Sequence, residues 1–289
     1  MSVTARAVAW VLLSNGLLSL VYASAKVMPD LISPTQILLV RYVSGFALVG
    51  GLVAWQGWHL IRGARWPLHL ARAVLGCFGG GAIVLASARM PIVDATAIGL
   101  LSVVMAVPLG VWLLGERLSP RQVVMILVAT LGAAVVMATR GAFQGMGPGY
   151  AVAAGIAGLG AALLAGEAIL IRTLSQSDPL LCVLFQVNGF GIGLMLGPAV
   201  LTWQPVPGLV LVAAALLGPL AIAAQFCTLK GYRMADVSIL APVDYSWLGF
   251  AALIGWIGFA ESPPPGVWLG VGLIAAGGLG LAHLPATDR

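Results

Sequence analysis

Glu167 and Asp244 stand well inside stretches of apolar sequence, where charged side chains are rare. A charge in such a span costs about 2.5–3.5 kcal/mol on insertion scales unless it meets a partner or water. Burial favours the neutral form of a carboxylate, whereas a nearby cation favours the charged form. A carboxylate held between these effects can load and release a proton, so we predict a coupling role for Glu167 or Asp244. The alternatives are an interfacial position or pairing with Arg172 for Glu167, and a satisfied core polar residue for Asp244.

Other polar and aromatic residues inside the apolar stretches predict a pocket for a small amphipathic solute. Asn15, Ser19 and Tyr22 are spaced four and three residues apart, so they share one helix face. Arg41 carries a planar guanidinium that suits a carboxylate; a structural ion pair or a bond to backbone carbonyls is the alternative. For each member of the set, an ordinary hydrogen bond between helices is the alternative. The predicted substrate-binding residues are Asn15, Ser19, Tyr22, Arg41, Tyr42, Ser102, Gln186, Asn188, Gln225, Tyr245 and Trp247.

Glu116 and Glu261 each follow an apolar stretch and precede a turn that contains proline. A carboxylate there can accept hydrogen bonds from the free N–H groups of the next helix and is favoured by that helix's positive end. We therefore predict a capping role for both residues, with contact to a solute as the alternative.

The chain that carries these residues is too apolar for a soluble domain. Of its 289 residues, 61% are hydrophobic and 8% are charged, whereas soluble domains carry about 25% charged residues. A spanning helix needs about 20 mainly apolar residues, and ten stretches qualify, so we predict an all-α integral membrane protein. The first stretch is longer than the apolar part of a signal peptide, about 7–15 residues, and we interpret it as a span. The expected spans are 7–27, 34–55, 70–89, 93–114, 121–139, 149–172, 179–202, 208–230, 235–259 and 266–284.

Lysine and arginine predict the orientation of these spans, because cytoplasmic loops carry an excess of them. With the N-terminus inside, ten basic residues fall in cytoplasmic segments and three in outer segments. We therefore expect both termini in the cytoplasm. The inner set is Arg6, Arg62, Arg65, Arg72, Arg117, Arg121, Arg172, Lys230, Arg233 and Arg289, and the outer set is Lys26, Arg89 and Arg140.

Several residues recur at a spacing of 145 and predict two five-helix halves, 1–140 and 141–289. Because five is odd, the second half would be inverted, as in secondary transporters whose site lies between the repeats. A duplication with only a structural outcome is the alternative. The recurring pairs are Pro34 and Pro179, Glu116 and Glu261, Pro120 and Pro265, and Gly132 and Gly277.

Glycines mark candidate breaks in the third and eighth spans, at Gly76 and Gly79–Gly81 and at Gly218-Pro219. Interrupted spans at matching places in two halves indicate a binding site, so we predict that these two helices are broken. Close packing through small residues is the alternative, and it is the interpretation that we prefer for three further glycines in the seventh span. These are Gly189, Gly193 and Gly197.

Motifs for enzymatic chemistry are absent from the sequence: it contains no GxSxG, no Walker loop and no HExxH. Cys77, Cys182 and Cys227 lie in separate spans without a ligand-like spacing, so we interpret them as apolar fillers. We expect no enzyme activity, no metal and no cofactor. The basic residues form no extended cluster, so nucleic acid is not an expected partner. The expected partners are the lipid bilayer and a small-molecule substrate, and a monomer is compatible with the sequence.

A Gly–Glu pair follows the fourth span in Leu114-Gly-Glu-Arg-Leu-Ser-Pro120, and a looser version, Phe259-Ala-Glu-Ser-Pro263, follows the ninth. With ten short-looped spans and Arg41 early in the second, the chain resembles the EamA branch of the drug/metabolite transporter superfamily. The second half departs from the pattern, because Gln186 stands where the repeat would place an arginine and Ala260 replaces the glycine.

This resemblance implies a multi-pass exporter of small metabolites in the bacterial inner membrane. In general pattern the chain is most similar to aromatic amino-acid exporters of the YddG type. On this basis we predict a secondary transporter of amino acids, aromatic ones included, with alternating access through a central cavity. Other classes stay open: a membrane enzyme acting on a lipid-linked substrate, a structural or assembly protein, and a transporter of nucleotide-sugar-like or drug-like solutes.

Overall fold

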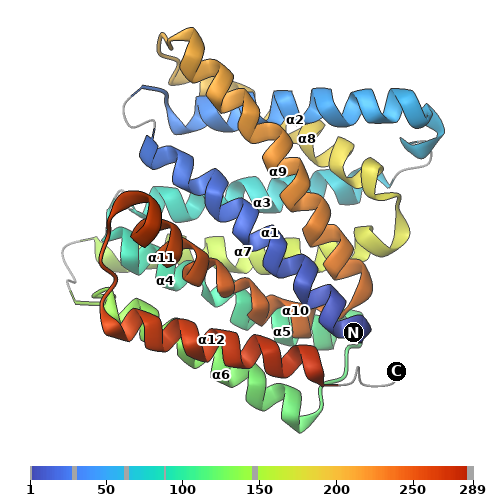
Figure 1. The fold of residues 1–289 in the computed structure, drawn as a ribbon. Helices are drawn as coiled ribbons and strands as arrows, with labels where there is room; N and C mark the ends of the chain where they lie inside the picture. Colours follow the sequence, from blue (N-terminus) through green and yellow to red (C-terminus); the bar gives the residue numbers. More distant parts are fainter. Residues whose placement is uncertain (1, 28–30, 62–64, 88, 145–148, 285–289) are drawn as a thin grey trace.

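The computed structural model of the chain is a bundle of helices (Figure 1). It describes residues 2–27, 31–61, 65–87, 89–144 and 149–284, without the side chains of 25–27. In this part of the chain, ten helical segments are long and apolar enough to cross a membrane, which confirms the predicted all-α class with ten spans. Of the basic residues counted for orientation, Arg62, Arg289 and the side chain of Lys26 lie outside the described part.

The helix bounds follow the predicted spans closely. The largest difference is at the end of the sixth span, expected at residue 172 and observed at Ser177. The first five spans are α1 (Val3–Val27), α2 (Pro34–Gln56), α3 (Trp66–Ser87), α4 (Ile92–Gly99) with α5 (Leu101–Leu114), and α6 (Pro120–Thr139), and the short helix η1 (Trp58–Ile61) follows α2. The last five are α7 (Tyr150–Ser177), α8 (Leu180–Leu201), α9 (Gly208–Met234), α10 (Val237–Asp244) with α11 (Ser246–Phe259), and α12 (Pro265–His283).

The two broken spans are not the predicted ones. Helices α3 and α9 run without interruption through Gly76 and Gly218, so the prediction of breaks there was wrong. The fourth and ninth spans are broken instead, at Leu100 and Tyr245. These two residues are 145 positions apart, and each separates a helix of 8 residues from one of 14 residues. The spacing found in the sequence therefore also describes the backbone.

Each break is a single tightened turn. The N–H of Val103 donates to the carbonyl of Leu100 at 3.1 Å, and the N–H of Leu248 donates to the carbonyl of Tyr245 at 3.0 Å. Bonds over three residues are of the 3₁₀ type, which is common where helices are interrupted. In the ninth span Pro242 adds to this effect, because it has no N–H to donate to the helix.

Some glycines of α3 and α9 serve close helix packing, but Cβ atoms at Gly80 and Gly81 would meet nothing within 4 Å. A Cβ at Gly79 would lie 2.9 Å from a leucine side chain of α7, and a Cβ at Gly218 would lie 2.7 Å from the backbone of α2. In α8, a Cβ at Gly189 would lie 3.1 Å from an aromatic ring of α2, but Cβ atoms at Gly193 and Gly197 would meet nothing within 4 Å. Packing therefore explains only the first of those three glycines.

The helices α2 and α6 begin with the same local signal. The hydroxyl oxygens of Ser33 and Ser119 each accept a hydrogen bond from the N–H three residues on. The serine N–H in turn donates to Oε1 of the glutamine there, Gln36 or Gln122. This reciprocal capping box, with proline at the first helical position, defines where a helix starts.

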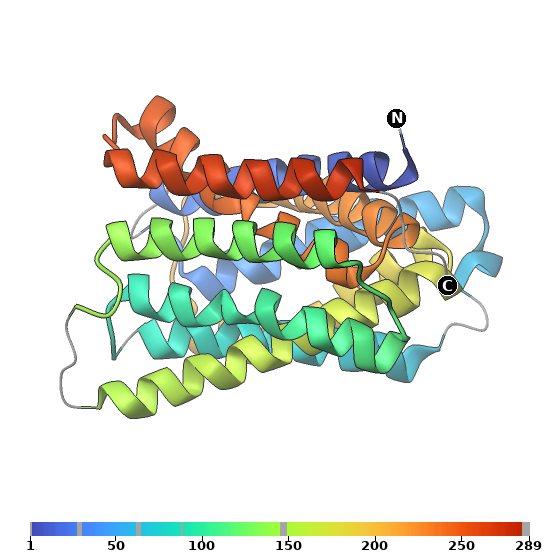
Figure 2. The ribbon, with the colours of Figure 1, turned by 90° about the horizontal axis from the view of Figure 1, so that it is seen from below.

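Most of the main helix contacts are preserved when the two halves are exchanged. Helix α6 packs along α12, and α2 along α8, so these contacts join equivalent helices. Helix α3 packs on α7 as α9 packs on α1, and α5 packs on α7 as α11 packs on α1. Figures 1 and 2 show α6 and α12 side by side along one edge of the bundle. This arrangement is consistent with inverted repeats.

The start of α1 and the end of α12 lie at the same end of the bundle (Figure 1). The hydroxyl of Ser2 donates to the carbonyl of Ala282 at 3.2 Å. Ten spans place both ends on the same side, because an even number of crossings returns the chain to the side on which it started.

Candidate functional site

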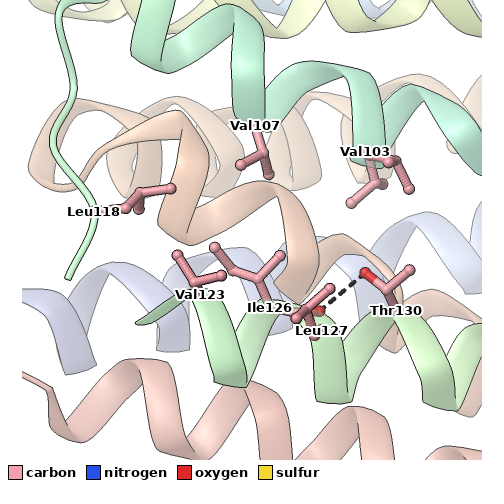
Figure 3. A pocket seen from close by; sticks show the side chains of 8 residues that line it. Val103, Val107, Leu118, Val123, Ile126, Leu127 and Thr130 are labelled. Atoms are coloured by element: carbon pink, nitrogen blue, oxygen red, sulfur yellow. Dashed lines mark hydrogen bonds between the residues drawn. The ribbon is translucent and has the colours of Figure 1, made fainter. Parts of the chain in front are cut away.

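Two cavities of about 220 Å³ each differ in their lining. The first lies between α5 and α6 and is aliphatic apart from Thr130 (Figure 3). The hydroxyl of Thr130 donates to the carbonyl of Ile126 at 2.9 Å, so this group is already used. Ligand sites combine apolar walls with a few convergent polar groups, which this cavity does not offer. Its lining is Val103, Val104, Val107, Leu118, Val123, Ile126, Leu127 and Thr130.

The second cavity has polar groups and is built by both halves of the chain. It lies between the broken fourth span, α7, α9 and the broken ninth span. Apolar walls, two carboxylates, a tyrosine and a tryptophan meet there, which is the composition of a small-molecule site. We call it the polar cavity; it contains four of the predicted residues, Ser102, Glu167, Asp244 and Trp247. Its full lining is Leu100, Ser102, Val103, Ala106, Leu164, Glu167, Ala168, Ile171, Thr228, Tyr232, Ala241, Asp244 and Trp247.

Asp244 lies at the end of α10, directly before the break, and neutral donors hold its carboxylate. The hydroxyl of Tyr232 donates to Oδ2 at 2.9 Å, and Nδ2 of Asn15 donates to Oδ1 at 3.3 Å. Asn15 also donates to the hydroxyl of Ser246 at 3.0 Å, across the break. Asp244 is thus both a hydrogen-bonded polar residue and part of the cavity wall, so α1, α9 and the break together position it.

Glu167 pairs with Arg72 of α3, so the alternative of pairing with Arg172 was wrong. The distance from Arg72 Nε to Glu167 Oε1 is 3.7 Å, and only 3% of Arg72 is exposed. The carboxylate lies against the backbone of α3 at Gly76, where an added Cβ would lie 2.8 Å from it. The glycine that suggested a broken helix therefore leaves room for a charged side chain of the neighbouring helix.

Arg172 instead ties α7 to the junction of α9 and α10. Its Nη2 lies 2.9 Å from Asp236 Oδ1, and its Nη1 donates to the carbonyl of Tyr232. Because Tyr232 also holds Asp244, this buried arginine supports one wall of the polar cavity through a second residue.

The predicted residues of α1, α9 and the second break differ in how deeply they are buried. Asn15 and Ser19 are buried, but Tyr22, expected on the same face, is 63% exposed. The hydroxyl of Ser19 and Oε1 of Gln225 are buried and have no hydrogen-bond partner among the described residues. Tyr245 is buried at the break itself. Within the described residues, Asn15 is the member of this set that forms a hydrogen bond to a residue lining the polar cavity.

A second group of predicted residues lies on α2 and α8 and does not contribute to the lining of the polar cavity. The guanidinium carbon of Arg41 lies 5.1 Å from the ring centroid of Tyr42. Asn188 is buried and donates to a carbonyl one turn earlier in its own helix at 2.7 Å, while Gln186 is half-buried. None of the four is in the lining of the polar cavity, so their part in solute binding stays a prediction.

Three residues of the site were missed in the sequence: Arg72, Thr228 and Tyr232. Arg72 was assigned to a cytoplasmic segment because the third span was expected to start at residue 70, but α3 starts at Trp66. Tyr232 was placed after the eighth span, but α9 continues to Met234. One further helical turn at each end carries these side chains into the bundle.

Glu116 caps a helix, although not the one that follows it. Its carboxylate accepts hydrogen bonds from the N–H groups of Val237 and Ser238, both at 2.8 Å, and from the Ser238 hydroxyl. These groups start α10 in the other half, whereas α6 is capped by Ser119. Glu261 is exposed, and its capping role stays a prediction.

A cluster of possible metal ligands lies outside the polar cavity. Single atoms of His69, Asp178 and Cys182 all lie within 4.8 Å of one another. Nε2 of His69 already lies 2.7 Å from Asp178 Oδ2, and Arg65 Nε lies 3.9 Å from Oδ1 of the same carboxylate. A cation there would have to displace the histidine contact and tolerate the arginine, so we interpret the cluster as a link between α3 and α8.

Residues 5–138 match the model of the EamA-like transporter family. The match covers the first five spans, 134 of the 289 residues and so somewhat less than half of the chain. Over this part the chain is similar to the family that the Gly–Glu pair and the ten spans indicated.

Two further comparisons found similar proteins. The riboflavin transporter of Vibrio cholerae serotype O1 is 30% identical over 118 residues, which are 38% of this chain and 37% of that protein. The alignment thus spans well under half of that relative. A crystal structure of a protein that is 22% identical superposes with a TM-score of 0.80 over 99% of this chain and 97% of that one. At this identity the likeness concerns the fold.

Proposed function

We propose that the chain is a secondary transporter that moves a small metabolite through the polar cavity by alternating access. The observation that supports this most directly is the position of the cavity, which lies where the broken spans of both halves meet α7 and α9. The halves, 1–140 and 141–289, would move against each other, with the tightened turns at Leu100 and Tyr245 as neighbours of the bound solute. Inverted repeats with a site at their interface are typical of such transporters.

Amino acids, aromatic ones included, are the substrates that we propose. A cavity of about 220 Å³ is below the usual range for drug-sized ligands, about 300–1,000 Å³, so it fits a single amino acid better than a three-ring flavin. A flavin is the second candidate, because a relative of 30% identity is a riboflavin transporter. We propose export across a bacterial inner membrane, with both termini cytoplasmic and the monomer as the working unit.

Asp244 and Glu167 are the proposed coupling groups. Both carboxylates line the cavity, one held by neutral donors and the other beside Arg72. A solute or a proton that enters the cavity can therefore contact both carboxylates. Asp244→Asn removes the titrating group and keeps one acceptor oxygen, which can serve Tyr232 while the weaker bond from Asn15 is lost.

The test is counterflow in proteoliposomes with labelled amino acids and riboflavin, with and without a pH gradient. Saturable exchange of one chemical class would support the proposal and identify the solute class. Folded protein that exchanges no solute would contradict transport and favour the alternative of an enzyme for lipid-linked substrates.

A matched variant separates coupling from structure. Asp94 is also fully buried, in the equivalent short helix α4, and accepts hydrogen bonds from the Phe143 N–H at 2.7 Å and the Tyr150 hydroxyl at 2.8 Å. Asp244→Asn should abolish pH-driven transport, whereas Asp94→Asn should keep it. Driven transport that survives in Asp244→Asn would remove Asp244 from the mechanism.

A further inference from the structure

We propose that Arg72 is the binding group for a carboxylate of the transported solute, which takes the place of the Glu167 carboxylate. The proposal rests on the transport function proposed above and adds to it the residue that recognises the carboxylate of the solute. The solute carries an anionic group that enters the polar cavity and reaches the buried guanidinium.

The hydrogen-bonding state of Arg72 is the first observation. The side chain is almost fully buried, yet its Nε and Nη1 have no hydrogen-bond partner among the described residues. Glu167 Oε1, at 3.7 Å from Nε, is too far for a hydrogen bond. Buried donors are almost always bonded in folded proteins, and a guanidinium presents its donors in a fork that matches a carboxylate. Arg72 therefore has two free donors of the kind that an anionic ligand uses.

The position of Glu167 is the second observation. Its carboxylate lies between Arg72 and the polar cavity: it lines the cavity, keeps 21% of its side chain exposed and rests against α3 at Gly76. Any solute that approaches Arg72 from the cavity meets Glu167 first. A ligand carboxylate must therefore displace this side chain or find it protonated.

The charges around the pair show why the exchange depends on protons. The titratable groups that face Glu167 are Arg72 and Cys77 of α3, Tyr42 of α2, Tyr232 of α9 and, across the cavity, Asp244 of α10. Arg72 is the one cation in this described set. Two anions beside one buried cation leave an unpaired buried charge, which is strongly unfavourable, so binding of a ligand carboxylate favours proton uptake by Glu167.

Arg41, the arginine that the sequence suggested for this role, has a different environment. It is half-buried on α2, stacks on Tyr42 and does not line the polar cavity. Arg72 lies directly behind a residue of the cavity wall, so the geometry favours Arg72.

The test compares two probes that differ in the carboxylate, L-phenylalanine and L-phenylalaninamide, by calorimetric titration of the purified full-length protein in nanodiscs. For the wild-type chain we expect L-phenylalanine to bind more tightly than the amide. We expect its affinity to fall as the pH is raised, because two anions beside the one buried cation are unfavourable and binding therefore takes up a proton at Glu167. Arg72→Gln should weaken L-phenylalanine binding about 10- to 100-fold, the loss expected for charge-assisted hydrogen bonds. It should leave the amide unchanged.

Three variants keep the test valid if Arg72→Gln does not fold. The double variant Arg72→Gln/Glu167→Gln has no unpaired buried charge and should bind both probes equally. Glu167→Gln alone should bind L-phenylalanine more tightly than wild type and without the pH dependence. Arg121→Gln, at an exposed arginine, is the matched control and should behave as wild type.

The outcomes separate the two proposals. Folded protein that binds and exchanges no solute of the panel contradicts the transport function and the role of Arg72 with it. Binding of riboflavin or other neutral solutes without carboxylates, or equal discrimination between the probes in the double variant and the wild type, leaves transport in place and overturns the role of Arg72.

Discussion

The two broken spans have the same backbone but different chemistry. Both consist of 8 and 14 helical residues around a tightened turn, and both end in a left-handed residue, Gly115 or Ala260. At the two following glutamates the halves differ: Glu116 is buried on the start of α10, whereas Glu261 is exposed. The repeat therefore defines where helices turn, and the side chains at equivalent positions have separate roles.

The polar side chains around the cavity also differ between equivalent positions of the two halves. None of the four groups that build its charged network has a similar residue at the equivalent position in the other half. The backbone of the two halves is therefore similar, whereas these polar side chains occur in one half only at each pair of equivalent positions. Such an asymmetric set of side chains suits a site that holds one solute. The pairs are Arg72 with Leu217, Glu167 with Tyr22, Asp244 with Gly99, and Asn15 with Gly160.

The largest difference between the halves is expected at the two glutamates. Glu116→Ala leaves the N–H groups of Val237 and Ser238 buried without an acceptor, and each such group costs about 1–3 kcal/mol. We expect a loss of about 3 kcal/mol in the free energy of unfolding. Glu261→Ala, at an exposed position, should cost less than about 1 kcal/mol.

Thermal unfolding of both variants in one detergent measures this difference. Glu116→Gln is the finer variant, because its amide has one acceptor oxygen for two N–H groups, and it should fall between wild type and Glu116→Ala. Equal losses for Glu116→Ala and Glu261→Ala would show that the contact with α10 does not distinguish the halves.

A second prediction concerns the seam between α6 and α12, where the halves should respond alike. A Cβ at Gly132 would lie 2.6 Å from the carbonyl oxygen of Gly270, and one at Gly277, its equivalent, 2.8 Å from the backbone of α6. Gly132→Ala and Gly277→Ala should each cost about 1–3 kcal/mol, because the helices must separate. Gly272→Ala, which would meet nothing within 4 Å, should be neutral or slightly stabilising. Clearly unequal losses at Gly132 and Gly277 in thermal unfolding would break the symmetry of this seam.

The sequence predicted the membrane spans better than the residues of the polar cavity. Ten apolar runs and their order were enough for the ten spans, because length and hydropathy decide which segments cross a membrane. The breaks at Leu100 and Tyr245 were missed because neither leucine nor tyrosine is a helix breaker, and packing between the halves decides where the turn tightens. Gly76 led to the opposite error, because it suggested a break in α3, whereas the helix is continuous there and the glycine leaves room for Glu167 of α7.

The charged pairs were the hardest part to predict. Glu167 and Arg172 are five residues apart and were paired by proximity, yet the partners are Arg72, 95 residues before Glu167, and Asp236, 64 residues after Arg172. Only the packing of α3 and α9 on α7 brings these residues together. By contrast, Asp244, Ser102 and Trp247 were found from residue type alone, because polar and aromatic side chains within spans tend to face the bundle interior.

The smallest predicted effect tests the left-handed residues that end the broken spans. Gly115 has φ 68° and Ala260 has φ 53°, a conformation that costs an L-residue about 1–2 kcal/mol and glycine nothing. Ala260→Gly should therefore stabilise the protein by about 0.5–1 kcal/mol, after the larger loss of chain entropy for glycine. Gly115→Ala should destabilise it by a similar amount, since an added Cβ meets no atom within 4 Å and only the backbone is strained. Opposite shifts in the unfolding temperature would show that both turns need the left-handed residue; a loss of stability in Ala260→Gly would show that the second half has adapted to its alanine.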